Sequence, residues 1–288
     1  MTRPRIAITM GDPAGIGPEI CLRLLAMPEV LEHGVPIVFG DDAVLRRAAS
    51  AMSLPAAYAV IAEEQWSTAH PEIAVPTVVD FQALGAGDGE TGCVSAETGR
   101  ASYRYIEAAI DAALAGQVDA ITTGPIHKEA LSAAGVPYPG HTEILAAKTK
   151  ADRYCMMLTS DEITCALVTT HVGLREAPEL LSVQRIVEVI QLSHDAMQQL
   201  RGKKPRLAIC GLNPHAGEGG LFGDGEEERF IVPAMEAARE KGIHIEGPLS
   251  PDTAFLPERR KATDCYICMY HDQGLIPLKT LAFDLGVN

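Results

Sequence analysis

The chain has 288 residues, of which 47% are hydrophobic and 5% aromatic, and its formal net charge is −14 at pH 7. No block of Lys or Arg offsets this charge, so a polyanionic nucleic acid is excluded as a partner. The apolar run before Gly11 is too short for a secretory signal, and no run approaches the ~20 residues of a membrane helix. Seven scattered cysteines without a disulfide framework indicate a reducing compartment, so we expect a cytoplasmic globular protein with an enzyme-like composition.

Short apolar runs alternate with helical patterns along the whole chain. The apolar runs, in order, occupy 5–10, 35–40, 118–124, 164–171, 205–215 and 264–274. The helical patterns begin near Pro18, Asp41 and His127, and two more cover 183–200 and 226–241. Such alternation is typical of βαβ units. It predicts an α/β fold, a parallel or mixed sheet with helices on both faces, and a second lobe that starts beyond Gly124.

Three of the apolar runs lead into a histidine: His171, His215 and His271. Ligands of open α/β sheets gather outside the carboxyl ends of the strands, so these imidazoles are expected to converge in one crevice. Three imidazoles with an open position are typical of a catalytic transition-metal site, with zinc as the first choice. A single histidine at a strand end is more often a hydrogen-bonded loop residue, but the repetition favours the metal site.

Other motifs give weaker signals. The segment GDGETG at 87–92 fits the Gly-x-Gly-x-x-Gly dinucleotide pattern, but Asp88 and Glu90 would face the pyrophosphate, which argues against a Rossmann site. The segment GHTEIL places His141 and Thr142 at a predicted helix N-terminus, where backbone amides and a hydroxyl bind phosphate or carboxylate. Four histidines in helical or polar contexts are interpreted as structural or surface residues: His33, His70, His194 and His244.

Long motifs across nearly the whole chain resemble one known family, the 4-hydroxythreonine-4-phosphate dehydrogenases of pyridoxal phosphate biosynthesis. These motifs are GDPAGIGPE, TGPIHKEAL, GHTE, TTHVGLRE, GLNPHAGEGGLFG, GPLSPDTAF and MYHDQGLIPLK. The resemblance implies a two-lobed α/β/α fold with a mixed sheet, similar to isocitrate and isopropylmalate dehydrogenases, which bind a nicotinamide cofactor without the Rossmann fingerprint. We expect residues 1–125, completed by 275–288, to form the first lobe, and 126–274 to form the second, with the metal-binding histidines and the dimer contacts.

The same resemblance implies the roles of individual residues. His171, His215 and His271 match the family's metal ligands, which are contributed across a homodimer interface. Four residues match substrate contacts: His141, Thr142, Lys279 and Asn288. Lys279, which would hold negative charge, and Asp252 of the SPDTAF motif are the candidate catalytic residues. The resemblance assigns no residue to the nicotinamide cofactor.

The implied reaction is a metal-dependent oxidation of 4-phosphooxy-L-threonine by NAD or NADP. The resulting 3-oxo acid loses its carboxylate to give 3-amino-2-oxopropyl phosphate, and the divalent ion is Zn, Mg or Co. One alternative is a dehydrogenase of D-threonate or D-erythronate 4-phosphate in sugar-acid catabolism. Alternatives of other classes are a metal-dependent phosphoester hydrolase and an inactive metal-binding dimer. The last arises because relatives continue past Asn288 with a further substrate-binding arginine, so we expect this chain to keep its dimer and metal while binding substrate weakly.

Overall fold

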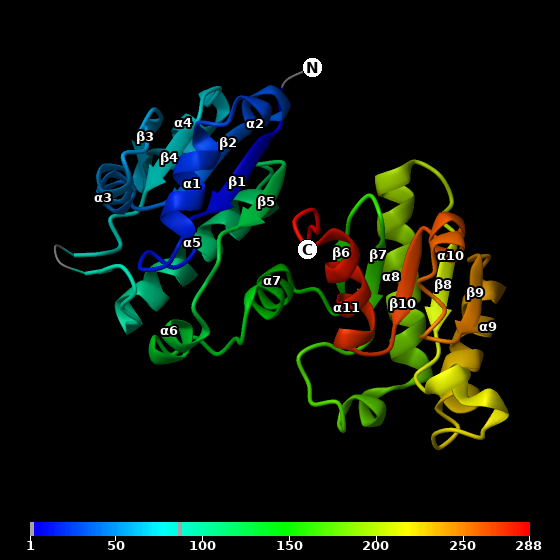
Figure 1. Ribbon diagram of the computed structural model, residues 1–288. Helices are drawn as coiled ribbons and strands as arrows, with labels where there is room; N and C mark the ends of the chain where they lie inside the picture. Colours follow the sequence, from blue (N-terminus) through cyan, green and yellow to red (C-terminus); the bar gives the residue numbers. More distant parts are fainter. Residues whose placement is uncertain (1–2, 86–87) are drawn as a thin grey trace. The chain divides into compact units, whose positions relative to one another are not determined.

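The computed structural model describes residues 3–85 and 88–288, so Gly87 of the GDGETG segment lies outside the described residues. The chain divides into two compact units, which are Met1–Ala151 and Asp152–Asn288 (Figure 1). Each unit contains one five-stranded sheet with helices packed against it. No helix within the described residues is long and apolar enough to cross a membrane.

The sheet of the first unit is entirely parallel and has the order β3-β4-β2-β1-β5. Its strands are β1 (Arg5–Thr9), β2 (Val35–Gly40), β3 (Ala59–Ala62), β4 (Thr77–Asp80) and β5 (Ala120–Thr123). Every residue of β2 is buried, so helices cover both of its faces. This coverage explains why the strand is a continuous apolar run and does not alternate with polar residues.

The longest helix of the first unit packs on β1, β2 and β5. It is α5 (Ala96–Leu114), which begins where the Ser95 side chain accepts a hydrogen bond from the Thr98 amide at 3.2 Å. The other helical segments are α1 (Gly17–Leu25), α2 (Pro28–His33), α3 (Asp42–Met52), η1 (Glu63–Gln65), α4 (Trp66–Ala69), η2 (His70–Glu72), α6 (Lys128–Ala133) and α7 (His141–Thr149). At Gly99 of α5 a Cβ would lie 2.0 Å from the Ala130 carbonyl oxygen, so this glycine lets α6 approach α5 closely.

The sheet of the second unit is mixed and has the order β6-β7-β10-β8-β9, in which only β6 is antiparallel to its neighbour. Its strands are β6 (Met156–Thr159), β7 (Thr164–Leu167), β8 (Leu207–Cys210), β9 (Ile245–Leu249) and β10 (Cys265–Cys268). The central strand β10 is buried throughout, and its residues alternate between two cores: Cys265 and Ile267 belong to one, Tyr266 and Cys268 to the other.

Helices cover both faces of this second sheet. The segments are η3 (Ala177–Leu180), α8 (Val183–Arg201), η4 (Pro214–Gly219), η5, a π-helical turn (Glu227–Ile231), α9 (Val232–Glu240), α10 (Pro257–Ala262) and α11 (His271–Ala282). Helices α8 and α9 pack together and contribute to the core that holds Ile267. Helix α11 packs on β7 and β10 and contributes Leu275 and Leu278 to the core that holds Tyr266. Both units therefore have the predicted α/β architecture.

The division between the units differs from the expected one. The boundary follows Ala151, not residue 125, because α6 and α7 pack on α5 of the first unit. The segment 275–288, which was expected to complete the first lobe, belongs to the second unit. There α11 packs on the sheet, and Val287 and Thr159 exchange two backbone hydrogen bonds of 2.8 Å. The apolar face of α11 explains this assignment, since it fills a core of the second sheet.

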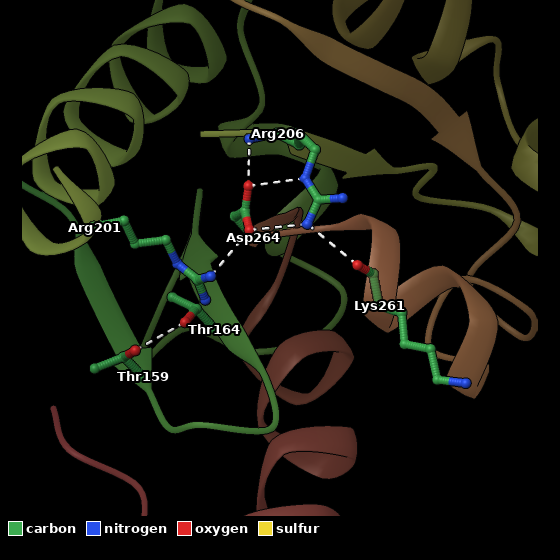
Figure 2. A network of polar contacts seen from close by, with 6 residues as sticks. All are labelled: Thr159, Thr164, Arg201, Arg206, Lys261 and Asp264. Atoms are coloured by element: carbon green, nitrogen blue, oxygen red, sulfur yellow. Dashed lines mark hydrogen bonds and ion pairs between the residues drawn. The ribbon is translucent and has the colours of Figure 1, made fainter. Parts of the chain in front are cut away.

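A buried carboxylate ties together the amino edge of the second sheet (Figure 2). Asp264, 3% exposed, directly precedes β10 and accepts hydrogen bonds from the Arg206 backbone amide at 2.7 Å, Nε at 3.1 Å and Nη2 at 3.1 Å. Arg201 Nη1 donates to the same carboxylate at 3.0 Å, and Arg206 Nη2 also donates to the Lys261 carbonyl at 3.2 Å. These bonds join the end of α8, the start of β8 and the end of α10 to β10.

Candidate active site

Two of the three predicted metal ligands face each other at the carboxyl edge of the second sheet. His171 follows β7 and His271 follows the adjacent strand β10, and their ring centroids are 5.7 Å apart. Both rings line a cavity of about 380 Å³ that Tyr270 and Ile276 also line. The Nδ1 atom of His271 lies 2.7 Å from Oδ1 of Asp272. A carboxylate in this position fixes the ring orientation and leaves Nε2 available for a ligand.

The third predicted ligand, His215, lies in the loop that follows β8, on the other side of β10. Its Nδ1 atom is 2.9 Å from Oε2 of Glu218, and its ring packs edge-on against Phe222 at 5.9 Å. The pKa of His215 is raised by this hydrogen bond, then by the charge of Glu218 and, more weakly, by that of Asp252. Among the described residues of one chain, no group of three His, Cys, Asp or Glu side chains is arranged to hold a metal. One chain thus pairs His171 with His271 but does not add His215 to them.

The His215 loop has an unusual backbone. His215, Ala216 and Glu218 have φ values of +54°, +52° and +45°, in the left-handed region that favours glycine. Each such residue costs roughly 1–2 kcal/mol relative to right-handed backbone. The conformation therefore requires contacts that hold the loop in place.

A second cavity, of about 510 Å³, contains the candidate catalytic residue Asp252. It shares Tyr270, Asp272 and Ile276 with the His171 and His271 cavity, so the two cavities adjoin. A hydrogen bond from the Ser250 hydroxyl is the main cause that lowers the pKa of Asp252, and the charge of His215 contributes. Asp252 is therefore ionised at neutral pH and lies within electrostatic reach of His215.

The remaining predicted residues of the second unit lie elsewhere on its surface. Lys279 is on the exposed side of α11, and no hydrogen bond or ion pair connects it to another described residue. Asn288 follows Val287, the residue that pairs with Thr159 of β6. Neither Lys279 nor Asn288 is among the residues that line the two adjoining cavities. Both side chains are thus exposed and free of fixed partners within the described ranges.

The first unit holds the predicted anion site. His141 is the first residue of α7, and its buried Nε2 atom has no hydrogen-bond partner among the residues that the structure describes. Burial lowers the pKa of His141, and a hydrogen bond with the Gly124 backbone opposes this effect. The ring is therefore neutral at pH 7. Thr142 follows in the first turn of α7 and is half-buried.

Sequence reasoning missed another histidine of the first unit. His127 immediately precedes α6, and its buried Nδ1 atom likewise has no partner within the described part of the chain. A buried polar atom without a partner costs free energy and commonly marks a ligand position. The signal was present in the sequence, because TGPIHKEAL places His127 just after β5, at the carboxyl edge of the first sheet.

Residues 32–288 match the family described as pyridoxal phosphate biosynthetic protein PdxA. The chain belongs to this family. It is 45% identical to 4-hydroxythreonine-4-phosphate dehydrogenase of Geobacter metallireducens, over 100% of this chain and 84% of the relative. It is 42% identical to D-threonate 4-phosphate dehydrogenase of Salmonella typhimurium, over 100% of this chain and 87% of the relative.

A solved structure extends the match to three dimensions. The crystal structure of 4-hydroxythreonine-4-phosphate dehydrogenase from Klebsiella pneumoniae superposes with a TM-score of 0.85 at 40% identity, covering 98% of this chain and 84% of that chain. The predicted family and fold class are therefore confirmed. The chain is an enzyme of the oxidoreductase class, like the relatives that it matches.

Proposed function

We propose that this PdxA chain is a metal-dependent, NAD- or NADP-linked dehydrogenase of 4-hydroxythreonine 4-phosphate. The observation that carries the proposal is the pair of imidazoles at adjacent strand ends, His171 and His271, with ring centroids 5.7 Å apart. In the reaction, the substrate hydroxyl loses a proton and its carbon transfers a hydride to the nicotinamide. The 3-oxo acid then loses its carboxylate as CO₂, and the carbon that carried the carboxylate takes up a proton to give 3-amino-2-oxopropyl phosphate.

The donor set fits a divalent metal ion. Neutral imidazoles bind Zn²⁺ at about 2.0–2.1 Å from nitrogen, and two rings at this separation are compatible with one shared ion. Asp272 orients His271 for this task, as carboxylates commonly do for ligating histidines. Because one chain does not bring His215 to the other two rings, we propose that a second copy in a homodimer supplies the third imidazole. A bound ion would act as a Lewis acid that lowers the pKa of the substrate hydroxyl and stabilises the enolate formed on decarboxylation.

The other predicted residues would bind and orient the substrate. His141, neutral and with a buried free Nε2 atom, supplies a hydrogen bond, and Thr142 adds a hydroxyl at the helix N-terminus. Lys279 supplies a positive charge for the phosphate or carboxylate, and Asn288 supplies an amide. Asp252, which is ionised and lines the adjoining cavity, is the candidate to accept the hydroxyl proton.

A second candidate substrate is D-threonate 4-phosphate, because a relative that is 42% identical carries that name. The two substrates share the phosphate, the carboxylate and the oxidised hydroxyl, and they differ in the amino or hydroxyl group at C2. The residues proposed above would contact only the shared groups, so they do not distinguish the two substrates. The sequence also left open D-erythronate 4-phosphate as the substrate and phosphoester hydrolysis as the reaction. The experiment below tests both.

The test measures reduced nicotinamide with each phosphorylated acid, with NAD and with NADP, before and after chelation of the metal. We expect nicotinamide reduction that disappears with a chelator and returns with Zn²⁺, Mg²⁺ or Co²⁺. His171→Ala should abolish the reaction, whereas His194→Ala, a histidine of α8 away from the site, should not. Release of inorganic phosphate without nicotinamide reduction would instead identify a hydrolase and reject the proposal.

A further inference from the structure

A buried carboxylate, Glu227, lies beside the loop that carries His215. Glu227 is 1% exposed and begins the π-helical turn ahead of α9. Its Oε1 accepts hydrogen bonds from the backbone amides of Leu212 at 2.9 Å and Asn213 at 2.8 Å, and its Oε2 accepts from Nδ2 of Asn213 at 3.0 Å. Within the described ranges, no Lys, Arg or His forms an ion pair with Glu227. The loop after β8 thus supplies the hydrogen bonds that compensate this charge.

The loop also closes around the carboxylate from its other end. A Cβ at Gly217, where φ is +79°, would lie 2.7 Å from Oε2 of Glu227, and a Cβ at Gly211 would lie 3.2 Å from Oε1. Both positions therefore favour a residue without a side chain. Two glycines of the GLNPHAGEGG segment, Gly211 and Gly217, thus make room for Glu227.

His215 lies between these two contact points, Asn213 and Gly217. His215 and Ala216 both have a left-handed backbone conformation. Residues other than glycine rarely keep this conformation in a loop that no contacts hold in place. The hydrogen bonds that Leu212 and Asn213 donate to the Glu227 carboxylate at one end, and the close packing of Gly217 at the other, restrict the backbone of the loop. We propose that Glu227 is the positioning residue for His215, holding the loop so that the imidazole is presented as a metal ligand.

The positioning role of Glu227 depends on the proposed function in one respect, which is that a metal ion is the ligand of His215. A purely structural role for Glu227 is the competing explanation, since a buried carboxylate also stabilises the fold. Asp264 provides the matched control, because it is a buried carboxylate that accepts backbone and side-chain hydrogen bonds at the opposite edge of the same sheet. Asp264 contacts none of the predicted ligands.

The experiment compares Glu227→Gln with Asp264→Asn in the full chain, using Co²⁺ as the probe because its visible absorption reports the ligand set. Glu227→Gln should weaken Co²⁺ binding about 10- to 100-fold and change the visible spectrum, as loss of a residue that orients a ligand does. Asp264→Asn should leave both unchanged. A double-mutant cycle with His215→Ala then tests the route, and in that background Glu227→Gln should have no further effect on Co²⁺ binding.

Two results would overturn the positioning role. One is Co²⁺ affinity of a folded Glu227→Gln variant equal to that of the wild type. The other is an equal loss of affinity in the wild-type and His215→Ala backgrounds. Absence of Co²⁺ binding by the wild type would instead reject the proposed metal site. In that event hydrogen exchange in the metal-free protein decides: faster exchange in 211–220 but not in α9 supports the role, and unchanged exchange rejects it.

If Glu227→Gln does not fold, Gly217→Ala probes the same contact from the loop. Its new Cβ would displace the loop from Oε2 of Glu227 while the carboxylate stays in place. Weaker Co²⁺ binding with faster exchange of the Leu212 and Asn213 amides is the expected result. Unchanged binding by this variant would show that the loop does not need the contact and would reject the proposal.

Discussion

Asp264 at the amino edge of the second sheet and His215 at its carboxyl edge are held in opposite ways. At the amino edge, Asp264 is buried and bound by Arg201 and Arg206. At the carboxyl edge, the exposed His215 is hydrogen-bonded to Glu218 of its own loop. One edge thus uses polar groups to join four segments of the fold, while the other leaves imidazole nitrogens available. The comparison separates a side chain that joins segments of the fold from imidazoles whose nitrogens are free to bind a ligand.

The largest effect should follow from removing a ligand at the carboxyl edge. We expect His171→Ala to reduce kcat/KM by at least about 10³-fold, because a lost metal forfeits several kcal/mol of transition-state stabilisation. The free energy of unfolding of the metal-free protein should change by less than about 0.5 kcal/mol, since the side chain is exposed. Steady-state kinetics and urea unfolding measure the two quantities. Substantial unfolding of this variant would show that His171 stabilises the fold, contrary to the role expected for this edge.

The complementary change is Asp264→Ala at the amino edge. It removes four hydrogen bonds to a buried carboxylate and leaves two guanidinium groups without their partner. We expect a loss of about 2–4 kcal/mol in the free energy of unfolding, because the guanidinium groups remain partly hydrated. Below the unfolding transition, Co²⁺ affinity should match that of the wild type. A stable Asp264→Ala variant with weakened metal binding would show that Asp264 serves the metal site and does not stabilise the fold.

The sequence predicted the carboxyl edge better than the amino edge, for a physical reason. Histidines that follow apolar strands have a local pattern, so His171 and His271 could be named from the sequence and the structure places them together. The Asp264–Arg206 pair is 58 residues apart, and neither residue belongs to a motif. The fold class followed from the same alternation of runs.

Features that depend on tertiary packing escaped sequence reasoning. The unit boundary was misplaced because the packing of α6 on α5 depends on Gly99, a glycine in the interior of a helix. The C-terminal segment was assigned to the first lobe, although the apolar face of α11 belongs to a core of the second. Glu227 was read only as part of a helical pattern, because burial of a carboxylate in an acidic run has no sequence signature.

A smaller effect is expected for Lys279, an exposed residue of α11 that is proposed to bind the substrate. Lys279→Met should raise KM for the phosphorylated acid about 10-fold or more, because a charge-assisted hydrogen bond contributes roughly 1.5–3 kcal/mol. Thermal stability should not fall, since the side chain is exposed and has no partner in the described residues. Lys203→Met, in the exposed turn between α8 and β8, is the matched control for loss of one charge. An unchanged KM would remove Lys279 from the site.

The smallest expected effect is the pH dependence of the amino edge. Burial alone would raise the pKa of Asp264, but hydrogen bonds from Arg206 and the charges of Arg206 and Arg201 outweigh it and lower the pKa. A carboxyl whose pKa is lower in the folded than in the unfolded protein stabilises the fold above the unfolded pKa of about 3.9. That contribution is lost as the pH falls through the folded pKa. The difference in unfolding free energy between the wild type and Asp264→Asn should therefore be constant near neutral pH and shrink below about pH 4. Urea unfolding at a series of pH values measures it, and a difference that grows on acidification would show that the carboxylate is not stabilised by its arginine partners.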